Sequence, residues 1–429
     1  MPQKYTQITP FVHLLTNDQN RAKTELEIVM TSGGSFFESD RNSGKKHLME
    51  HCIASRTKSM DYKTFKDFQF SNSIAINAYT GPLPLAVNAT THSSQFEKSF
   101  DSLAEMIFDP TFDQAILDQE KEIVLREITE RRGSPDYQLY YFTMNQIYSQ
   151  GALTRHETLG NSEMVAQTTI QDFVDLHEQN LNNSHLIINL SGGNVNEEYV
   201  KTVVNKYLGQ KTKNIENILN PNDKNTINYR PNSDLLKFNF LPLVHELAHE
   251  QAEISILLPC ELNFDNLPAT KIFKELFLSF YGVIYSRLRD ELGYVYGIYG
   301  NFRNDIQMLE ISMSCEIKYI TPIVNEVKQM LNDWSKYFDT KKFDELKNIL
   351  TMKIDISSDE PSQANSHTEK ILRTYDKIEL HSEFGDRLNS VQPDDVKKIY
   401  ENIMNNLDRM QVLAVSKDKT VEEVNVNWS

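Results

Sequence analysis

The chain has 429 residues, a formal net charge of −16, and 39% hydrophobic and 24% charged residues. This length predicts about two to four domains, and the composition excludes wholesale disorder. The excess of carboxylates argues against a nucleic-acid partner, because phosphate binding needs clustered lysines and arginines. We find no apolar run long enough to cross a membrane and no secretory or transit pattern at the start, so we expect a cytoplasmic location and no membrane partner.

The first half alternates strand and helix patterns. Period-2 alternation and turn residues predict strands at 24–30, 73–79, 85–90 and 184–190, of which the second and third form a hairpin around Gly81-Pro82. Apolar stripes and capping residues predict helices at 44–55, 94–108, 113–132, 135–149, 169–179 and 196–207.

A polar stretch rich in Asn, Lys and Pro, residues 211–234, predicts a linker. A second cycle of the same element order follows. We expect its strands at 252–258, 294–303, 306–315 and 411–415, one helix at 265–281, and long helical patterns across 318–404. The shared order indicates two related halves, although no sequence repeat is visible.

The first half contains the motif His47-Leu48-Met49-Glu50-His51. On a helix, positions 47 and 51 fall on one face, so both imidazoles can reach one zinc ion. Glu50 can then take a proton from the water that zinc activates. This is the HxxEH pattern. The alternative for so short a motif is a surface helix with ordinary polar residues.

A catalytic zinc site needs a third protein ligand. Glu120 and Glu127 share a face of the predicted helix 113–132, seven residues apart. Such a pair suits one ligand and one partner that orients a ligand. A solvated charged helix is the alternative.

Other histidines and the cysteines offer weaker signals. His245 and His249 fit HExxH, but the segment leads directly into a strand and leaves little room for a helix. The remaining histidines stand alone in the sequence, and we expect surface or hydrogen-bonded side chains. They are His13, His92, His156, His177, His185, His367 and His381. Cys52, Cys260 and Cys315 form no CxxC and are far apart, which argues against a disulfide framework or a cysteine-type zinc site.

The motif and its surroundings resemble the insulinase/pitrilysin family of zinc peptidases, and the resemblance runs along nearly the whole chain. Gly34-Ser35 and Glu38 precede the motif as the family's Gly-Ser…Glu turn does. Glu127, 76 residues after His51, falls where the family places its third ligand. The resemblance therefore assigns zinc, one ion per chain, to His47, His51 and Glu127.

The resemblance extends to three further parts of the chain. Glu120 matches an additional Glu seven residues before the third ligand. The edge strand that binds substrate in the family matches Ile76, Asn77, Ala78 and Tyr79. In the second half, the family's Arg/Tyr segment matches Arg287 and Tyr294, where the Tyr follows Leu-Gly. Arg289 and Tyr296 have the same spacing and offer a rival register. The run Cys52–Thr57 departs from the family's usual residues after the motif, which affects packing beside the site.

The resemblance implies an α+β fold with two similar α/β halves, each an antiparallel sheet with helices packed on it. Residues 1–210 would carry the metal and 235–429 the Arg/Tyr segment. It further implies a zinc-dependent endopeptidase that hydrolyses peptides or unfolded segments inside a chamber. In that chemistry Glu50 is the general base, Tyr294 donates to the developing oxyanion, and Arg287 binds a peptide carbonyl.

Chains of this length resemble half of such a chamber. Because this chain holds both the metal set and the Arg/Tyr pair, we expect a homodimer, with a heterodimer as the alternative. The competing functions are a non-catalytic or partner-dependent chamber subunit of the same fold, a maturation peptidase with a narrow substrate, and a conventional HExxH enzyme. The sequence names neither the natural substrate nor its cleavage preference.

Overall fold

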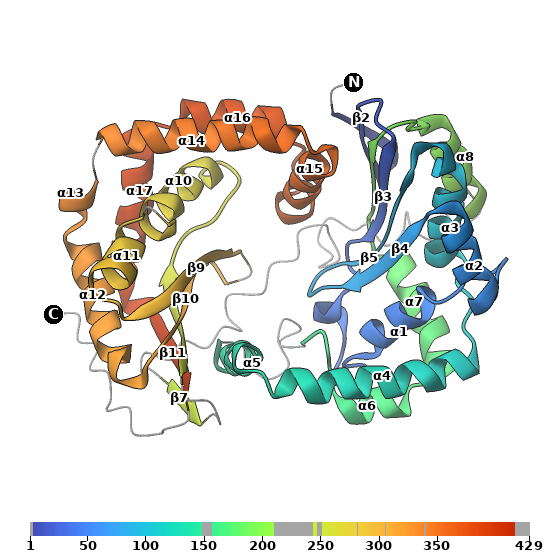
Figure 1. Ribbon diagram of the computed structural model, residues 1–429, viewed down its shortest axis with the longest axis horizontal. Coiled ribbons are helices and arrows are strands. Elements are labelled where there is room, and N and C mark those ends of the chain that lie inside the picture. Colours follow the sequence, from blue (N-terminus) through green and yellow to red (C-terminus); the bar gives the residue numbers. More distant parts are fainter. Residues whose placement is uncertain are drawn as a thin grey trace. The chain divides into compact units, whose positions relative to one another are not determined.

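The computed structural model describes residues 3–147, 157–209, 243–246, 251–280, 282–304, 306–338 and 340–416. The described residues group into two compact units (Figure 1). The first lies within Met1–Glu130, Gly151–Tyr229 and Ile356–His381, and the second within Arg131–Gln150, Arg230–Asp355 and Ser382–Ser429. Each unit is a sheet with helices packed on it, so the expected α+β fold with two similar halves is confirmed.

The first unit is built on a six-stranded sheet. In spatial order its strands are β1 (Lys4–Thr9), β2 (Val12–Asp18), β6 (Leu186–Gly192), β3 (Lys23–Met30), β5 (Leu85–His92) and β4 (Ala75–Thr80). All neighbours are antiparallel except β2 and β6. The β4–β5 hairpin forms as predicted, with Ala78 opposite Val87, and it places β4 at the edge of the sheet.

Helices cover one face of this sheet. They are α1 (Lys45–Ile53), α2 (Tyr62–Asn72), α3 (Phe96–Phe108), α4 (Gln114–Arg132), α6 (Ser162–Gln167), α7 (Ile170–Asn183) and α8 (Glu197–Leu208). The apolar stripe of α3 explains its place: Phe100, Leu103 and Ile107 are fully buried, and α3 packs on β3 and β5. The same core includes Leu48, Met49 and Cys52 of α1, which fixes the helix that carries the metal motif.

The opposite face of the first sheet is covered in part by α15 (Pro361–Tyr375), which packs on β2 and β6. Leu372 joins a small core with Leu15 and Ile187. The side-chain amide of Asn365 donates to the backbone oxygen of Leu190 at 3.0 Å. A helix from the C-terminal half of the sequence therefore completes the first unit.

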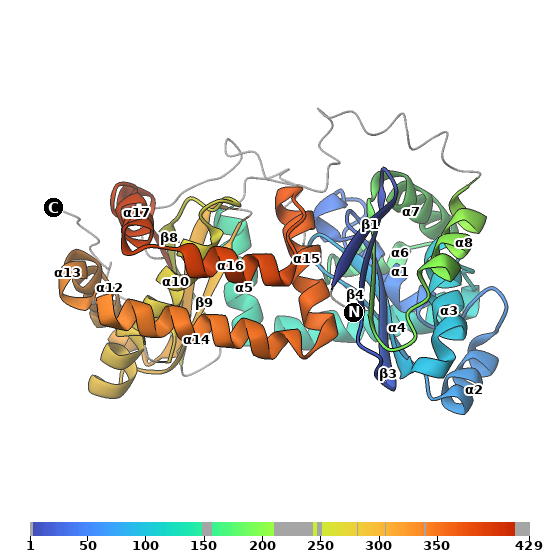
Figure 2. The same cartoon turned by 90° about the horizontal axis from the view of Figure 1, so that it is seen from above.

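The second unit has a five-stranded sheet. Its spatial order is β7 (Leu243–Glu246), β11 (Gln411–Ser416), β8 (Ala252–Pro259), β10 (Met308–Cys315) and β9 (Val295–Arg303), and only β7 and β11 run parallel. The helices are α5 (Pro135–Ile147), α10 (Leu267–Leu278), α11 (Val283–Tyr285), α12 (Ile320–Asn332), α13 (Trp334–Tyr337), α14 (Thr340–Ser358), α16 (His381–Ser390) and α17 (Pro393–Met404). α14 and α16 run side by side (Figure 2), joined by the Thr351 hydroxyl, which donates to the Asn389 side chain at 2.8 Å.

The units are not contiguous in sequence as the ranges 1–210 and 235–429 would require. α5 packs on β8 and β11 of the second unit, whereas α15 belongs to the first. The expected linker at 211–234 lies outside the described residues. Six of the α-helices and strands described here were not predicted: β1, β2, α2, α6, β7 and α11. None of the described helices has the length and hydropathy that a membrane span requires.

Candidate metal centre

The helix that carries the motif is held at its N-terminus by a buried carboxylate. Glu38, 1% exposed, accepts hydrogen bonds from the backbone N–H groups of Gly44 at 2.8 Å and Lys46 at 2.7 Å. Gly44 lies in the left-handed region, with φ of 89°, and a Cβ there would meet the Leu159 backbone oxygen at 2.8 Å. These contacts fix where α1 begins and therefore where its side chains point.

His47 and His51 lie one turn apart on α1, and Glu127 approaches them from α4. The Nε2 atoms of the two histidines are 3.3 Å apart. The Glu127 Oε2 atom is 3.6 Å from His47 Nε2 and 3.7 Å from His51 Nε2. Among the described residues, these three form the only His, Cys, Asp or Glu cluster whose ligand atoms converge closely enough for a metal ion.

These distances fit a zinc ion. Ligands about 2.0–2.2 Å from one tetrahedral centre lie about 3.3–3.6 Å apart. The Glu127 Oε2 atom is also shielded from solvent and accepts no hydrogen bond from the described residues. A shielded carboxylate oxygen that faces two imidazole nitrogens is costly without a cation between them.

The carboxylates Glu120 and Glu50 complete the site. Glu120 Oε2 lies 3.0 Å from His51 Nδ1, so it can orient the ring and leave Nε2 for a metal. Glu50 Oε2 lies 4.0 Å from His47 Nε2 and accepts a long hydrogen bond of 3.4 Å from the Thr80 hydroxyl. The predicted motif residues and both predicted glutamates are thus brought together.

The protonation of these side chains follows from burial and charge. Burial, together with the neighbouring His51, lowers the pKa of His47 to about 4, so the ring is neutral and can act as a ligand. Burial would lower the pKa of His51 too, but the hydrogen bond to Glu120 and the nearby carboxylates raise it. Burial raises the pKa of Glu50 to about 7, partly offset by His51.

The predicted substrate strand, β4, borders the same cavity. This cavity has a volume of about 480 Å³ and is lined by the motif residues, both glutamates and Asn77, Ala78, Tyr79 and Thr80. Ile76 does not line it; its side chain packs against the hydrophobic core of the first unit. Tyr79 points to the other face of the sheet, where its hydroxyl lies 3.2 Å from Glu27.

The predicted Arg/Tyr pair lies in the second unit. Arg287 forms ion pairs with Glu326 and Glu291, both at 2.8 Å, and these bonds raise its pKa. Tyr294 stacks on Tyr319, with ring centres 4.4 Å apart, and packs against the second core. The rival pair is more open: the Arg289 guanidinium lies 6.0 Å from the ring of Tyr296, which is 67% exposed.

The other candidates do not form a second centre among the described residues. His245 lies in β7, opposite Val415, and therefore not on a helix; His249 lies outside the described residues. His13 and His185 share a hydrogen bond of 3.0 Å, as expected for non-ligand histidines, although nothing in the sequence pairs them. His156 lies outside the described residues. All three cysteines are buried and free.

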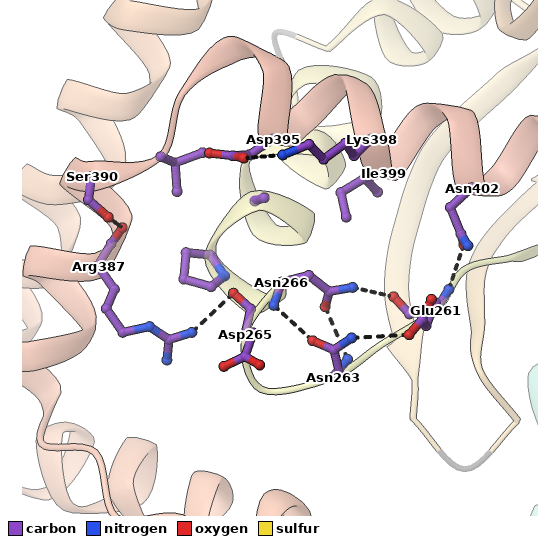
Figure 3. Close-up of a pocket in the computed structure, with 13 residues that line it drawn as sticks. Glu261, Asn263, Asp265, Asn266, Arg387, Ser390, Asp395, Lys398, Ile399 and Asn402 are labelled. Atoms are coloured by element: carbon purple, nitrogen blue, oxygen red, sulfur yellow. Dashed lines mark hydrogen bonds and ion pairs between the residues drawn. The ribbon is translucent and has the colours of Figure 1, made fainter.

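A larger cavity, about 530 Å³, lies in the second unit between the 261–266 loop and helices α16 and α17 (Figure 3). Its polar groups largely satisfy one another. Arg387 donates to the Phe264 backbone oxygen, and Lys398 pairs with Asp395 at 3.1 Å. It contains no cluster of metal-ligating side chains. We therefore place the candidate site in the first unit.

Five residues outside the predicted site set line the metal cavity: Ala54, Ser55, Tyr62, Lys66 and Thr80. Thr80 follows the predicted substrate strand and contacts Glu50. Tyr62 and Lys66 lie on α2, a helix absent from the prediction. Asp61, whose side chain accepts a hydrogen bond from the Thr64 backbone N–H, is the capping signal that could have revealed α2.

Comparisons with known proteins identify the family and the fold. Residues 13–162 match the family model described as insulinase, peptidase family M16, and residues 167–350 match the model described as peptidase M16 inactive domain. Among solved structures, a peptidase M16 inactive domain from Pseudomonas fluorescens has a TM-score of 0.77 at 14% identity, covering 97% of this chain and 99% of its own. A protease from Helicobacter pylori has a TM-score of 0.76 at 15% identity, covering 96% and 99%.

Curated relatives are similar over shorter stretches. A probable mitochondrial-processing peptidase subunit beta from Arabidopsis thaliana is 25% identical over 192 residues, 45% of this chain and 36% of the relative. An uncharacterized zinc protease from Rickettsia felis is 24% identical over 164 residues, 38% of this chain and 40% of the relative. In both cases the matched segment spans less than half of the relative. The two model matches, which together run from residue 13 to residue 350, show that this chain belongs to the insulinase family of peptidases, M16.

Proposed function

We propose that this protein is a zinc-dependent endopeptidase. The observation that carries the proposal is the convergence of His47 Nε2, His51 Nε2 and Glu127 Oε2 at mutual distances of 3.3 to 3.7 Å. Zinc at this position would lower the pKa of a water molecule to about 7 and polarise a peptide carbonyl. The name of the Rickettsia relative, a zinc protease, supports this choice of metal.

The chain's own residues supply the rest of the chemistry. Glu50 lies beside the three ligands and would take the proton of the attacking water and deliver it to the leaving amine. Glu120 would hold His51 in the tautomer that leaves Nε2 for the metal.

The edge position of β4 supports a sequence-tolerant mode of peptide binding. Within the described residues, β4 pairs only with β5, so its outer edge is open to an extended peptide. Backbone hydrogen bonds along Ala75–Thr80 would carry that peptide toward Glu50. The substrates would be peptides or unfolded segments, since a folded chain cannot add a strand.

Three further points belong to this proposal. Tyr294 would donate to the developing oxyanion and Arg287 would bind a peptide carbonyl, as the family resemblance implies. Two copies of the chain would enclose the substrate; the Arabidopsis relative is itself named as a subunit, which keeps a different partner chain as the alternative. We propose a cytoplasmic location on the basis of the sequence.

The test compares wild type with Glu50→Gln on a pool of unstructured peptides, with zinc per chain measured on both. We expect about one zinc in each protein and cleavage by wild type alone. Zinc in both proteins with no cleavage by either would favour a non-catalytic or partner-dependent subunit. Equal cleavage by both would remove Glu50 from the mechanism.

A further inference from the structure

The helix α2 forms one wall of the metal cavity. Tyr62, the first residue of the helix, and Lys66, one turn later, line the same cavity as Glu50 and His51. The Lys66 ammonium lies 5.6 Å from the centre of the Tyr62 ring, which is 48% exposed. An aromatic ring and a cation are therefore presented together beside the metal ligands.

Two small residues line the cavity between His51 and α2. Ala54 and Ser55 line it at the end of α1. The Ser55 hydroxyl is already used, since it donates to the Cys52 backbone oxygen at 2.7 Å. A substrate side chain beside the reacting bond can thus reach the α2 wall without displacing a large group.

Lys66 is the single lysine or arginine that lines this cavity, whose other formally charged groups are carboxylates. Its neighbours one turn away on α2 are Tyr62, Lys63, Gln69 and Phe70, and none is acidic. Across the described part of the chain, Lys66 forms no ion pair within 4.0 Å. Its positive charge is therefore available to a ligand in the cavity.

We propose that Lys66 makes the site select peptides that carry a carboxylate at a residue next to the scissile bond. The inference rests on the proposed peptidase function and adds its substrate class. The apolar stem of such a residue would pack on the Tyr62 ring while its carboxylate pairs with the Lys66 ammonium. Two sources offer this group: an internal Asp or Glu side chain, and the free C-terminus of a peptide cut near its end.

The expected preference is modest. Lys66 is exposed, and exposed ion pairs are weakened by solvent and salt. We expect kcat/KM for a peptide with Glu beside the bond to exceed that of its Gln twin by about threefold to tenfold at low salt. Lysine at the same position should be worse than glutamine.

The test uses one peptide frame with Glu, Gln or Lys placed on either side of the scissile bond, each made with an amidated and with a free C-terminus. Cleavage is measured with wild type, Lys66→Ala, Lys66→Glu and the control Lys63→Ala, whose side chain does not line the cavity. Binding of the same peptides to the zinc-loaded Glu50→Gln protein, alone and combined with each change, gives a readout independent of cleavage.

We expect the ratio of kcat/KM for the Glu peptide to that for the Gln peptide to fall to about one in Lys66→Ala. In Lys66→Glu the Lys peptide should become the preferred one, while Lys63→Ala should retain the wild-type preference for Glu. If Lys66 improves cleavage only for peptides with a free C-terminus, the carboxylate that it binds is the C-terminal one and not an Asp or Glu side chain. Lys66-dependent binding without cleavage would uphold the inference and overturn the peptidase proposal. Cleavage or binding that ignores the charge of the neighbouring residue, or a failure to bind any of the peptides, would overturn the inference.

Discussion

The buried pair of Glu38 and Lys46 should hold the motif helix in place, and its removal gives a demanding test of the structure. Both residues are 1% exposed. Glu38 accepts two backbone hydrogen bonds at the start of α1, and the Lys46 ammonium donates to the Ser32 backbone oxygen at 3.0 Å. Burial raises the pKa of Glu38 and lowers that of Lys46, and the opposite charge of each residue opposes the shift of the other.

Glu38→Ala leaves the Lys46 ammonium buried without its counter-charge. Two backbone N–H groups also lose their acceptor, and a buried donor left without one costs about 1–3 kcal/mol of unfolding free energy. Replacing Lys46 with methionine in the same protein removes the stranded charge at similar volume, so Glu38→Ala/Lys46→Met should regain at least about 1 kcal/mol over Glu38→Ala. It should not recover fully, because two backbone N–H groups still lack their acceptor.

Urea denaturation followed by circular dichroism measures these differences, and hydrogen exchange of the α1 amides localises them. The control is Glu401→Ala, which breaks the exposed Lys397–Glu401 pair, with side chains 61% and 51% exposed, and should cost at most about 0.5 kcal/mol. If Glu38→Ala costs no more than the control, or if the double variant is no more stable than Glu38→Ala, the reasoning about this pair is refuted.

Three other predictions concern the metal site, the second unit and the pH dependence. Glu120→Gln should weaken zinc binding by about tenfold to a hundredfold in chelator competition, because His51 loses its charged orienting partner; unchanged affinity would contradict the role of Glu120. Tyr294→Phe should lower kcat more than Tyr296→Phe, and the reverse order would favour the rival register. Burial lowers the pKa of His13 to about 3 from its ordinary 6.5, so its contribution to stability is present above pH 6.5 and is lost as pH falls toward 3. His13→Phe should flatten that acid loss in urea denaturation at pH 7 and pH 5, and an equally steep loss would contradict it.

The sequence predicted the elements whose signals are local. The alternation in 24–30 gave β3, and the turn at Gly81-Pro82 gave the β4–β5 hairpin. It missed β2 because both faces of that strand are buried. Its sequence, VHLLTND, therefore shows no regular alternation of apolar and polar residues. It missed α2 because Phe65 is its single fully buried residue, which leaves a weak apolar stripe.

The residues of the candidate site also fall into those with a local sequence signal and those without one. His47, Glu50 and His51 were predictable because their spacing on one helix is itself the signal. Glu127 lies on a different helix, and only the family resemblance selected it over Glu120. The contact of Thr80 with Glu50 depends on how β4 packs against α1. This packing is a tertiary contact that no local pattern in the sequence indicates.

The exchange of helices between the units had no local signal either. α5 and α15 have ordinary helical patterns, and their positions in the sequence place each with the neighbouring half. Tertiary packing determines which unit each helix joins. Leu372 of α15 packs with Leu15 and Ile187 in a small core, which places α15 on the first sheet. The helical patterns therefore predicted that α5 and α15 form, but the position of each helix in the sequence did not predict which sheet it packs on.

The most direct test of the central claim is to measure zinc content and peptide cleavage on the same preparations of wild type, Glu50→Gln and Glu127→Gln. The structure predicts that wild type has both zinc and cleavage, that Glu50→Gln keeps zinc and loses cleavage, and that Glu127→Gln loses both. Stoichiometric zinc with full cleavage in Glu127→Gln would contradict the assigned ligand set, and cleavage by Glu50→Gln at the wild-type rate would contradict the assigned base.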